Sequence, residues 1–217
     1  MGGKQVRTMQ GVSNCYSIRQ DADMLSENAE TIAREQRWLA PGEPFDFTKA
    51  YTGRLVSQPF GLQRFRRLNK LLAQKDWHDF DSLAQILRDH FDDELIAPRF
   101  GETAGTFISI CMHMRDWGES ETSASLLATY DDTIGIIGRY APVQPCLSAY
   151  IPVYMIGKLP QKMQTADRFF DEGSLWWQMK LMSLLVTVDE NAFANEVRQK
   201  LKSLEAQFRT RRRKQSA

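Results

Sequence analysis

The spacing of apolar residues predicts helices over most of the first ninety positions. Leucines and phenylalanines recur every three or four residues between positions 61 and 74, and a second such run follows an expected N-cap at Asp81 or Ser82. Ser26 is the expected N-cap of an earlier helix, and the aromatic-rich residues 45–51 predict a short one. The first part of the chain is therefore expected to be mainly helical.

Two further helices are predicted near the C-terminus. Ser174 is the expected N-cap of a helix rich in Leu, Met and Trp, which is apolar on most sides and should therefore be buried. A last helix is expected to start at Asp189 or Asn191, with one apolar stripe that packs along the body or against a partner helix. The stripe consists of Phe193, Val197, Leu201, Leu204 and Phe208.

Between these helical regions, residues 106–160 alternate between short apolar runs and polar breaks, which is typical of strands. Strands are predicted at 106–114, 122–129 and 134–140, joined by short polar turns into a meander. The alternating residues 12–18 predict one more strand. The pattern as a whole predicts an α+β fold in which helices pack on a central sheet.

Composition narrows the classes of protein. At 217 residues and 42% hydrophobic, the chain can bury the core of one large domain or two small ones. A formal net charge of +1 argues against nucleic acid as a partner. No apolar run is long enough to span a membrane, and the first residues lack a signal-sequence core. The three cysteines are too few for a disulfide framework, so a reduced, cytoplasmic setting is expected.

Motifs for phosphate binding, metalloprotease chemistry and serine hydrolysis do not occur in the sequence. The histidines, His78, His90 and His113, lie far apart along the chain. We interpret His113 as a hydrogen-bonded core residue in preference to a metal ligand. Cys111 and Cys146 are interpreted as small buried hydrophobic residues in preference to nucleophiles. We therefore expect no metal and no other cofactor.

The basic residues 209–214 (RTRRRK) are the densest charge in the chain. Such a run can bind nucleic acid or direct nuclear import. It can also be a solvated helix C-terminus, where cations interact favourably with the helix dipole. The nearly neutral chain and the lack of interleaved aromatic residues favour the second interpretation.

An ordered set of segments extends the argument beyond composition. These segments are SNCYSIRQDADMLSENAETIAREQRW, FDFTKAYTG, QRFRRLNKLL, LAQILRDHF, ISICMHM, ETSASLLATY, QPCLSAYIPVYMIGKLP and SLWWQMKLM. Together they span most of residues 11–185 and resemble the secernin and cysteine-type dipeptidase family of N-terminal-nucleophile hydrolases. The resemblance implies part of an αββα sandwich, an antiparallel sheet covered by helices, that hydrolyses peptide amide bonds without a metal.

The resemblance covers only the C-terminal half of that family's pattern. In the family the catalytic cysteine is the first residue of the mature chain, and its free amino group activates its thiol. Cys15 lies within a predicted strand and cannot act in this way. Residues 1–189 would thus be the C-terminal portion of the hydrolase domain, and residues 190–217 an amphipathic helix with a basic tail. We expect no dipeptidase activity from this chain alone. The expected partners are a nucleophile-bearing half or a second copy, with a small peptide as substrate.

Two residues match positions that assist catalysis in related hydrolases. By resemblance, Asn14 would donate a hydrogen bond to the developing oxyanion. Arg64, or alternatively Arg67, would approach the nucleophile. The structural alternatives are a polar residue that bonds its own turn and an arginine on a solvated helix face. A second function also stays open, in which the chain is a non-catalytic interaction or scaffold protein.

Overall fold

The chain forms two compact units, an N-terminal unit of residues Met1–Asp76 and a C-terminal unit of residues Trp77–Ala217. Each has its own cluster of buried apolar side chains. The computed structural model describes residues 11–52, 58–74, 79–91, 109–113, 121–133, 135–155, 157–165 and 167–215.

The described part of the N-terminal unit forms the helices α1 (Ala29–Glu35), α2 (Phe47–Tyr51) and α3 (Gln58–Gln74), as the apolar spacing predicted. Asp46 caps α2, because its carboxylate accepts a hydrogen bond from the Lys49 amide. The N-cap of α1 is Asn28, two residues later than the predicted Ser26. The core between α1 and α2 is small; its buried members are Ala33, Leu39 and Ala50.

Residues 12–18 do not form the predicted strand. They run as irregular chain, and Gly11 and Gly61 mark where this segment and α3 approach each other closely. A strand requires a neighbour to satisfy its backbone groups, and the described part of this unit contains only helices and irregular segments. Alternation of polar and apolar residues therefore misled the prediction here.

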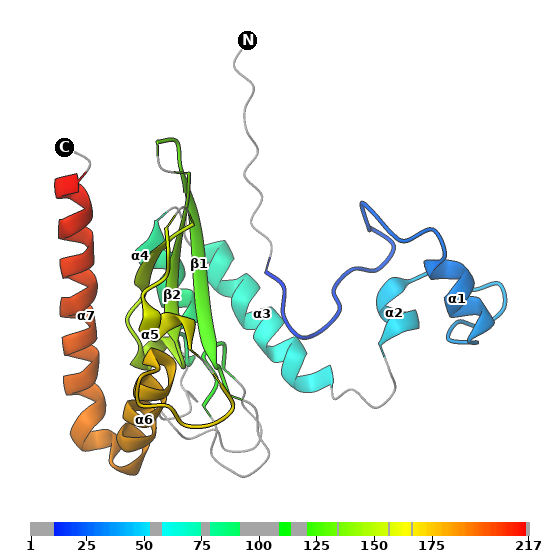
Figure 1. The fold of residues 1–217 in the computed structure, drawn as a ribbon. Helices are drawn as coiled ribbons and strands as arrows, with labels where there is room; N and C mark the ends of the chain where they lie inside the picture. Colours follow the sequence, from blue (N-terminus) through cyan, green and yellow to red (C-terminus); the bar gives the residue numbers. More distant parts are fainter. Residues whose placement is uncertain are drawn as a thin grey trace. The chain divides into compact units, whose positions relative to one another are not determined.

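The C-terminal unit is built around an antiparallel sheet of three strands in the order β1–β2–β3 (Figure 1). Ala128 pairs with Gly138, and Gly138 pairs with Val153. The elements are α4 (Phe80–Leu87), β1 (Ala124–Asp131), β2 (Gly135–Pro142), the 3-10 turn η1 (Pro145–Leu147), β3 (Ile151–Tyr154), α5 (Gln161–Gln164), α6 (Leu175–Val188) and α7 (Glu190–Gln215). The predicted α+β class is thus confirmed.

The predicted meander exists, but its third strand was misplaced. β1 and β2 correspond to the strands predicted at 122–129 and 134–140. The described residues 109–113 form no strand, and the rest of the strand predicted at 106–114 lies outside the described residues. The third strand is β3, which carries Pro152. A proline in a strand is typical of a sheet edge, because it cannot donate to the ladder.

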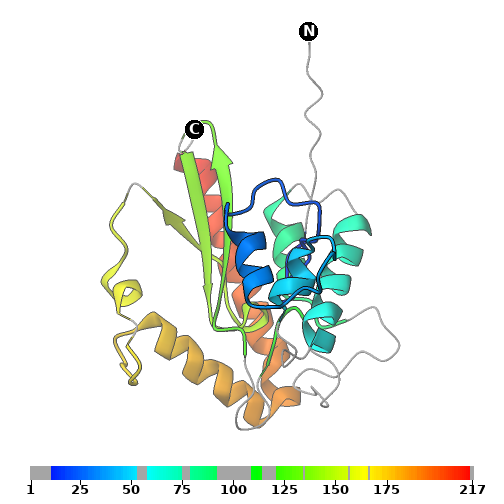
Figure 2. The same cartoon turned by 90° about the vertical axis from the view of Figure 1, so that its right-hand side faces the viewer.

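One face of this sheet is covered by helices. α4 packs on β1 and α7 packs on β3, both on the face that carries Leu127 and Arg139. Figure 1 shows both helices on the same side of the sheet, and in Figure 2 α7 passes behind the strands. Ala84 of α4, Ala141 of β2 and Tyr150 form a buried cluster there. This face is therefore an ordinary helix-on-sheet core.

The opposite face is apolar as well, yet its large side chains stay exposed. Leu126 is 58% exposed, Tyr130 75% and Ile136 51%. A side chain at Gly138 would contact the ends of Leu126 and Met155, so these two side chains lie over this glycine. The residues on this face are Ala124, Leu126, Ala128, Tyr130, Ile136, Gly138, Tyr140, Ile151, Val153 and Met155. We call this set the uncovered face.

α6 begins after Ser174 as predicted, but it is not buried. Leu181, Leu184 and Leu185 are each about half exposed. The helix turns its polar residues inward instead: Lys180 forms an ion pair with Glu121, and Ser183 donates to Gln144 at 2.8 Å. Buried polar groups need such partners, and these partners decided which face of α6 packs inward.

α7 starts at Glu190 and belongs to the C-terminal unit, where it packs on α6, η1 and β3. The structure thus divides the chain between Asp76 and Trp77, whereas the sequence analysis separated this helix at residue 189. The predicted apolar stripe matches the packed face only in part. Val197 packs against the core, and Leu201 and Phe208 are partly buried. Phe193 and Leu204 are exposed, while Ala194 and Glu205 are buried.

The start of α4 also follows from local chemistry. Asp79 caps this helix, because its carboxylate accepts a hydrogen bond from the Ser82 amide at 2.7 Å. The predicted caps, Asp81 and Ser82, lie inside the helix. Among the described residues, no helix is long and apolar enough to cross a membrane.

Candidate functional site

The structure brings together the two residues that the resemblance singled out. Arg64 Nη1 donates a hydrogen bond to Asn14 Oδ1 at 3.2 Å, although the residues are fifty positions apart. Ser13 Oγ lies 3.0 Å from the same amide oxygen. Arg67, the alternative to Arg64, is buried on α3. Asn14 and Arg64 therefore form a polar pair at the surface of the N-terminal unit.

Gly61 explains how this pair forms. A Cβ atom at Gly61 would lie 3.1 Å from both Asn14 O and Cys15 Cβ, so a side chain here would displace the segment. The hydroxyl of Ser13 is also within 3.2 Å of the Gly61 carbonyl oxygen and can donate to it. The 13–15 segment thus lies directly on the first turns of α3, and Arg64, one turn further, reaches Asn14.

The pair has a defined donor geometry. The Asn14 amide oxygen accepts from Arg64, so the NH₂ group is the donating end that this side chain can offer to a ligand. Asn14 is exposed and Arg64 is half-buried. An exposed amide donor beside a guanidinium is suited to an anionic or developing negative charge. Neither group is a nucleophile.

A second cluster lies in the C-terminal unit and was not foreseen. His90, Cys111, His113 and Cys146 are all buried, and their side-chain nitrogen and sulfur atoms all lie within 4.8 Å of one another. His113 Nε2 is 3.1 Å from His90 Nε2 and 3.1 Å from Cys146 Sγ. It is 3.6 Å from Cys111 Sγ. We call these four residues the His/Cys cluster.

Three separate segments deliver the cluster. His90 follows the C-terminus of α4 by three residues, and Cys146 is the middle residue of η1. Cys111 and His113 come from the irregular segment 109–113, which the Cys111 amide ties to the Asp89 carbonyl at 3.2 Å. Their spacing of two in non-helical chain is the arrangement that brings two side chains to one side.

A buried ion pair fixes these segments relative to one another. Arg88 donates to the carbonyl oxygens of Pro145 at 2.7 Å and Ser148 at 3.1 Å, on either side of Cys146. The same guanidinium pairs with Glu205 of α7 at 2.5 Å. Glu205 also accepts from the Tyr150 amide at 2.8 Å. Arg88 is two residues before His90, so one side chain sets the position of two cluster members.

Burial and neighbours move the pKa values of the two thiols in opposite directions. Burial raises the pKa of Cys111, but hydrogen bonds with Cys146, His113 and His90 outweigh it and hold this pKa well below the usual 9.0. For Cys146, burial and then the neighbouring Cys111 raise the pKa well above that value. Cys111 is therefore the thiol that ionises first.

The expectations for these residues were only partly right. Cys111, Cys146 and His113 are buried as expected. His113 also has the polar neighbours expected of a core histidine, but its convergence with His90 and the two cysteines was not predicted. The short Cys111-x-His113 spacing was the available signal, but His90 and Cys146 join it only through the fold.

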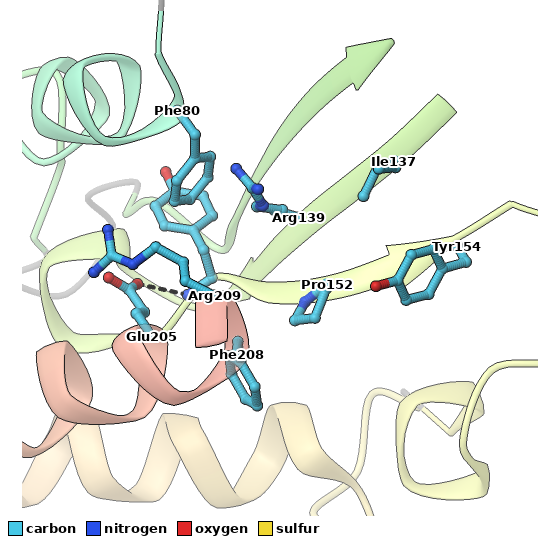
Figure 3. Close-up of a pocket in the computed structure, with 9 residues that line it drawn as sticks. Phe80, Ile137, Arg139, Pro152, Tyr154, Glu205, Phe208 and Arg209 are labelled. Atoms are coloured by element: carbon cyan, nitrogen blue, oxygen red, sulfur yellow. Dashed lines mark hydrogen bonds between the residues drawn. The ribbon is translucent and has the colours of Figure 1, made fainter. Parts of the chain in front are cut away.

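A pocket lies between α4, the covered face of the sheet and α7 (Figure 3). Its charged groups have partners. Arg139 lies over the Phe80 ring at 3.9 Å, Arg209 pairs with Asp81, and Glu205 pairs with Arg88. These contacts link α4 to the sheet and to α7, so the charged side chains that line the pocket are paired within the fold.

Comparison of the sequence with protein-family models and with curated proteins gives no match. The functional argument therefore rests on the structure itself: the uncovered face of the sheet, the Asn14–Arg64 pair and the His/Cys cluster.

Proposed function

We propose that this chain supplies the C-terminal part, without the nucleophile, of a secernin-like cysteine dipeptidase. In this proposal a sheet from a nucleophile-bearing half packs on the uncovered face of β1–β3. The nucleophile-bearing half is a segment outside these 217 residues. The observation that carries the proposal is the apolar character of that face.

An antiparallel sheet with one covered face normally presents polar side chains on the other. Here the outward positions of all three strands are apolar or glycine, with Leu126, Tyr130 and Ile136 more than half exposed. Sheet faces of this kind are stable when a second layer covers them, and two sheets pack about 10 Å apart face to face. A second sheet with helices on its far side would complete an αββα sandwich.

The N-terminal unit would contribute the polar pair. In amide hydrolysis by a thiolate, the carbonyl oxygen gains negative charge as the sulfur–carbon bond forms. The Asn14 NH₂ group would donate to that oxygen, and Arg64 would hold Asn14 through its amide oxygen. The thiol and its amino-group base would come from the other half.

Association can be tested separately from catalysis. The chain is co-expressed with a tagged nucleophile-bearing half of a secernin-like dipeptidase, and co-purification is measured. Tyr130→Lys places a charge on the uncovered face and should abolish association, whereas Thr133→Lys in the exposed β1–β2 turn should not. Equal co-purification of both variants would show that this face is not the interface.

The complex is then assayed with dipeptides. Asn14→Ala should lower turnover by a factor of about 100, because one oxyanion donor is lost, while association stays normal. The matched control is Asn28→Ala, whose side chain makes no capping bond in α1. Arg64→Ala should lower turnover and its helix neighbour Arg66→Ala should not. Unchanged turnover in Asn14→Ala would remove this residue from the site.

The second candidate function is a non-catalytic interaction protein. The observation that favours it is α6, which exposes Leu181, Leu184 and Leu185 in addition to the uncovered face of the sheet. The assay above separates the two functions. A stable complex without dipeptide turnover supports the interaction protein, and turnover that depends on Asn14 supports the hydrolase.

A further inference from the structure

We propose that His90, Cys111, His113 and Cys146 bind one Zn²⁺ ion as a closed, structural N₂S₂ centre. This inference is independent of the proposed hydrolase function. It differs from the expectation from sequence that the chain holds no metal.

The distances fit a tetrahedral ion. With Zn–N of about 2.0–2.1 Å and Zn–S of about 2.3 Å, neighbouring ligand atoms lie about 3.3–3.8 Å apart. His113 Nε2 is 3.1, 3.1 and 3.6 Å from the ligand atoms of His90, Cys146 and Cys111. All atoms of the set lie within 4.8 Å of one another. The widest separation exceeds a tetrahedral edge by about 1 Å, which small side-chain rotations can close.

The charge balance also fits a buried ion. Two thiolates carry two negative charges, so a zinc centre with two neutral imidazoles has no net charge. A neutral centre avoids the large cost of burying an unpaired charge. Most of the surroundings are apolar, because Leu147, Val186 and Ala194 form one buried cluster with Cys111 and Cys146. The guanidinium of Arg198 lies beside Cys146 and would favour its thiolate form. Binding releases the two thiol protons to solvent and leaves both imidazoles unprotonated.

The donor set selects the metal and the role. Thiolate and imidazole favour zinc, whereas Mg²⁺ and Ca²⁺ require oxygen ligands, and this cluster has none. Four protein ligands fill a tetrahedral ion and leave no position for water or substrate. The centre is therefore structural. It would join the end of α4, the segment 109–113 and η1, three segments that are distant in sequence.

The test uses the full chain. Purified protein should contain one zinc ion per chain. After removal by a chelator, Co²⁺ should restore the intense visible absorption of a tetrahedral site and the near-ultraviolet thiolate-to-cobalt band. Zinc should raise the melting temperature by about 5–15 °C over the stripped chain, as expected for tight binding to a domain of this size.

The variants assign the ligands. Cys146→Ser and His113→Ala should each weaken zinc binding by a factor of at least about 100. Cys15→Ser is the matched control, because this third cysteine lies in the N-terminal unit and packs against Gly61 of α3. The Cys15→Ser variant should bind zinc as the wild type does. If a variant does not fold, the cobalt spectrum of the wild type still shows whether the site is tetrahedral. Absence of zinc together with an octahedral cobalt spectrum, or equal binding by Cys146→Ser, would overturn the proposal.

Discussion

The two units place the same kind of ion pair in different surroundings. In the N-terminal unit, Arg34 and Glu30 pair at 2.6 Å with side chains 39% and 52% exposed. In the C-terminal unit, Arg88 and Glu205 pair at 2.5 Å with side chains 24% and 7% exposed. The exposed pair is screened by water, whereas the buried pair also organises backbone carbonyls around Cys146.

The same contrast holds for the candidate sites. The Asn14–Arg64 pair is at the surface, where its donors can meet a ligand. The His/Cys cluster is buried, so its groups contact the rest of the fold and not solvent. The two candidate sites thus differ in burial, and substitutions at other polar groups test what burial contributes to stability.

The largest effect is expected for Glu205→Ala. The change leaves Arg88 without its buried partner and the Tyr150 amide without its acceptor, which should cost about 3 kcal/mol in the free energy of unfolding. Urea unfolding of the full chain measures it. Glu205→Gln keeps an acceptor for the amide and should lose less. A loss below about 1 kcal/mol for Glu205→Ala would mean that this pair stabilises the fold no more than an exposed ion pair does.

An intermediate effect is expected at high pH. Burial raises the pKa of Tyr150 to about 12, although a hydrogen bond with Ser125 at 2.7 Å opposes the shift. Between pH 10 and 12 the unfolded chain has lost this proton and the folded chain still holds it. Stability should therefore fall as pH rises through this window, by up to about 2–3 kcal/mol.

The comparison with Tyr150→Phe isolates that proton. Unfolding is measured from pH 9 to the highest pH at which the fold persists. The variant loses the Ser125 hydrogen bond at every pH, but the difference from wild type should shrink as pH rises. A difference that stays constant across the window would mean that Tyr150 does not contribute to the alkaline loss.

The smallest effect is expected for Glu30→Ala in α1. Its pair with Arg34 is exposed and spaced i,i+4, so its loss should change the free energy of unfolding by no more than about 0.5 kcal/mol. Arg34 also keeps its hydrogen bond to the Glu43 carbonyl. Thermal melting of the variant beside Glu205→Ala gives the comparison directly. Similar losses in both would remove the distinction between the units.

Helices could be predicted because their signals are local. Apolar spacing located α3, and Ser174 located the start of α6 to the residue. Which face of α6 is buried could not be predicted, because that face is set by Glu121 and Gln144, which accept hydrogen bonds from Lys180 and Ser183. Which face of a helix packs inward is a property of its neighbours.

The strands show the same limit. β1 and β2 are joined by a short turn and could be predicted, whereas β3 contains Pro152 and follows η1. Residues 12–18 have a strand pattern without a strand partner. Sequence reasoning reached Asn14 and Arg64 by resemblance, and the structure adds that they touch. The His/Cys cluster could not be predicted from the sequence, since His90 and Cys146 lie 23 and 33 positions from His113.

The burial of all four cluster side chains has a kinetic consequence. An ion at their centre has no direct route to solvent, so exchange requires local opening of the chain around η1. Metal would accordingly enter and leave the folded chain slowly, at a rate set by that local opening. Zinc or Co²⁺ added to the stripped chain should therefore bind slowly, and a low concentration of urea should speed uptake by favouring the locally open state.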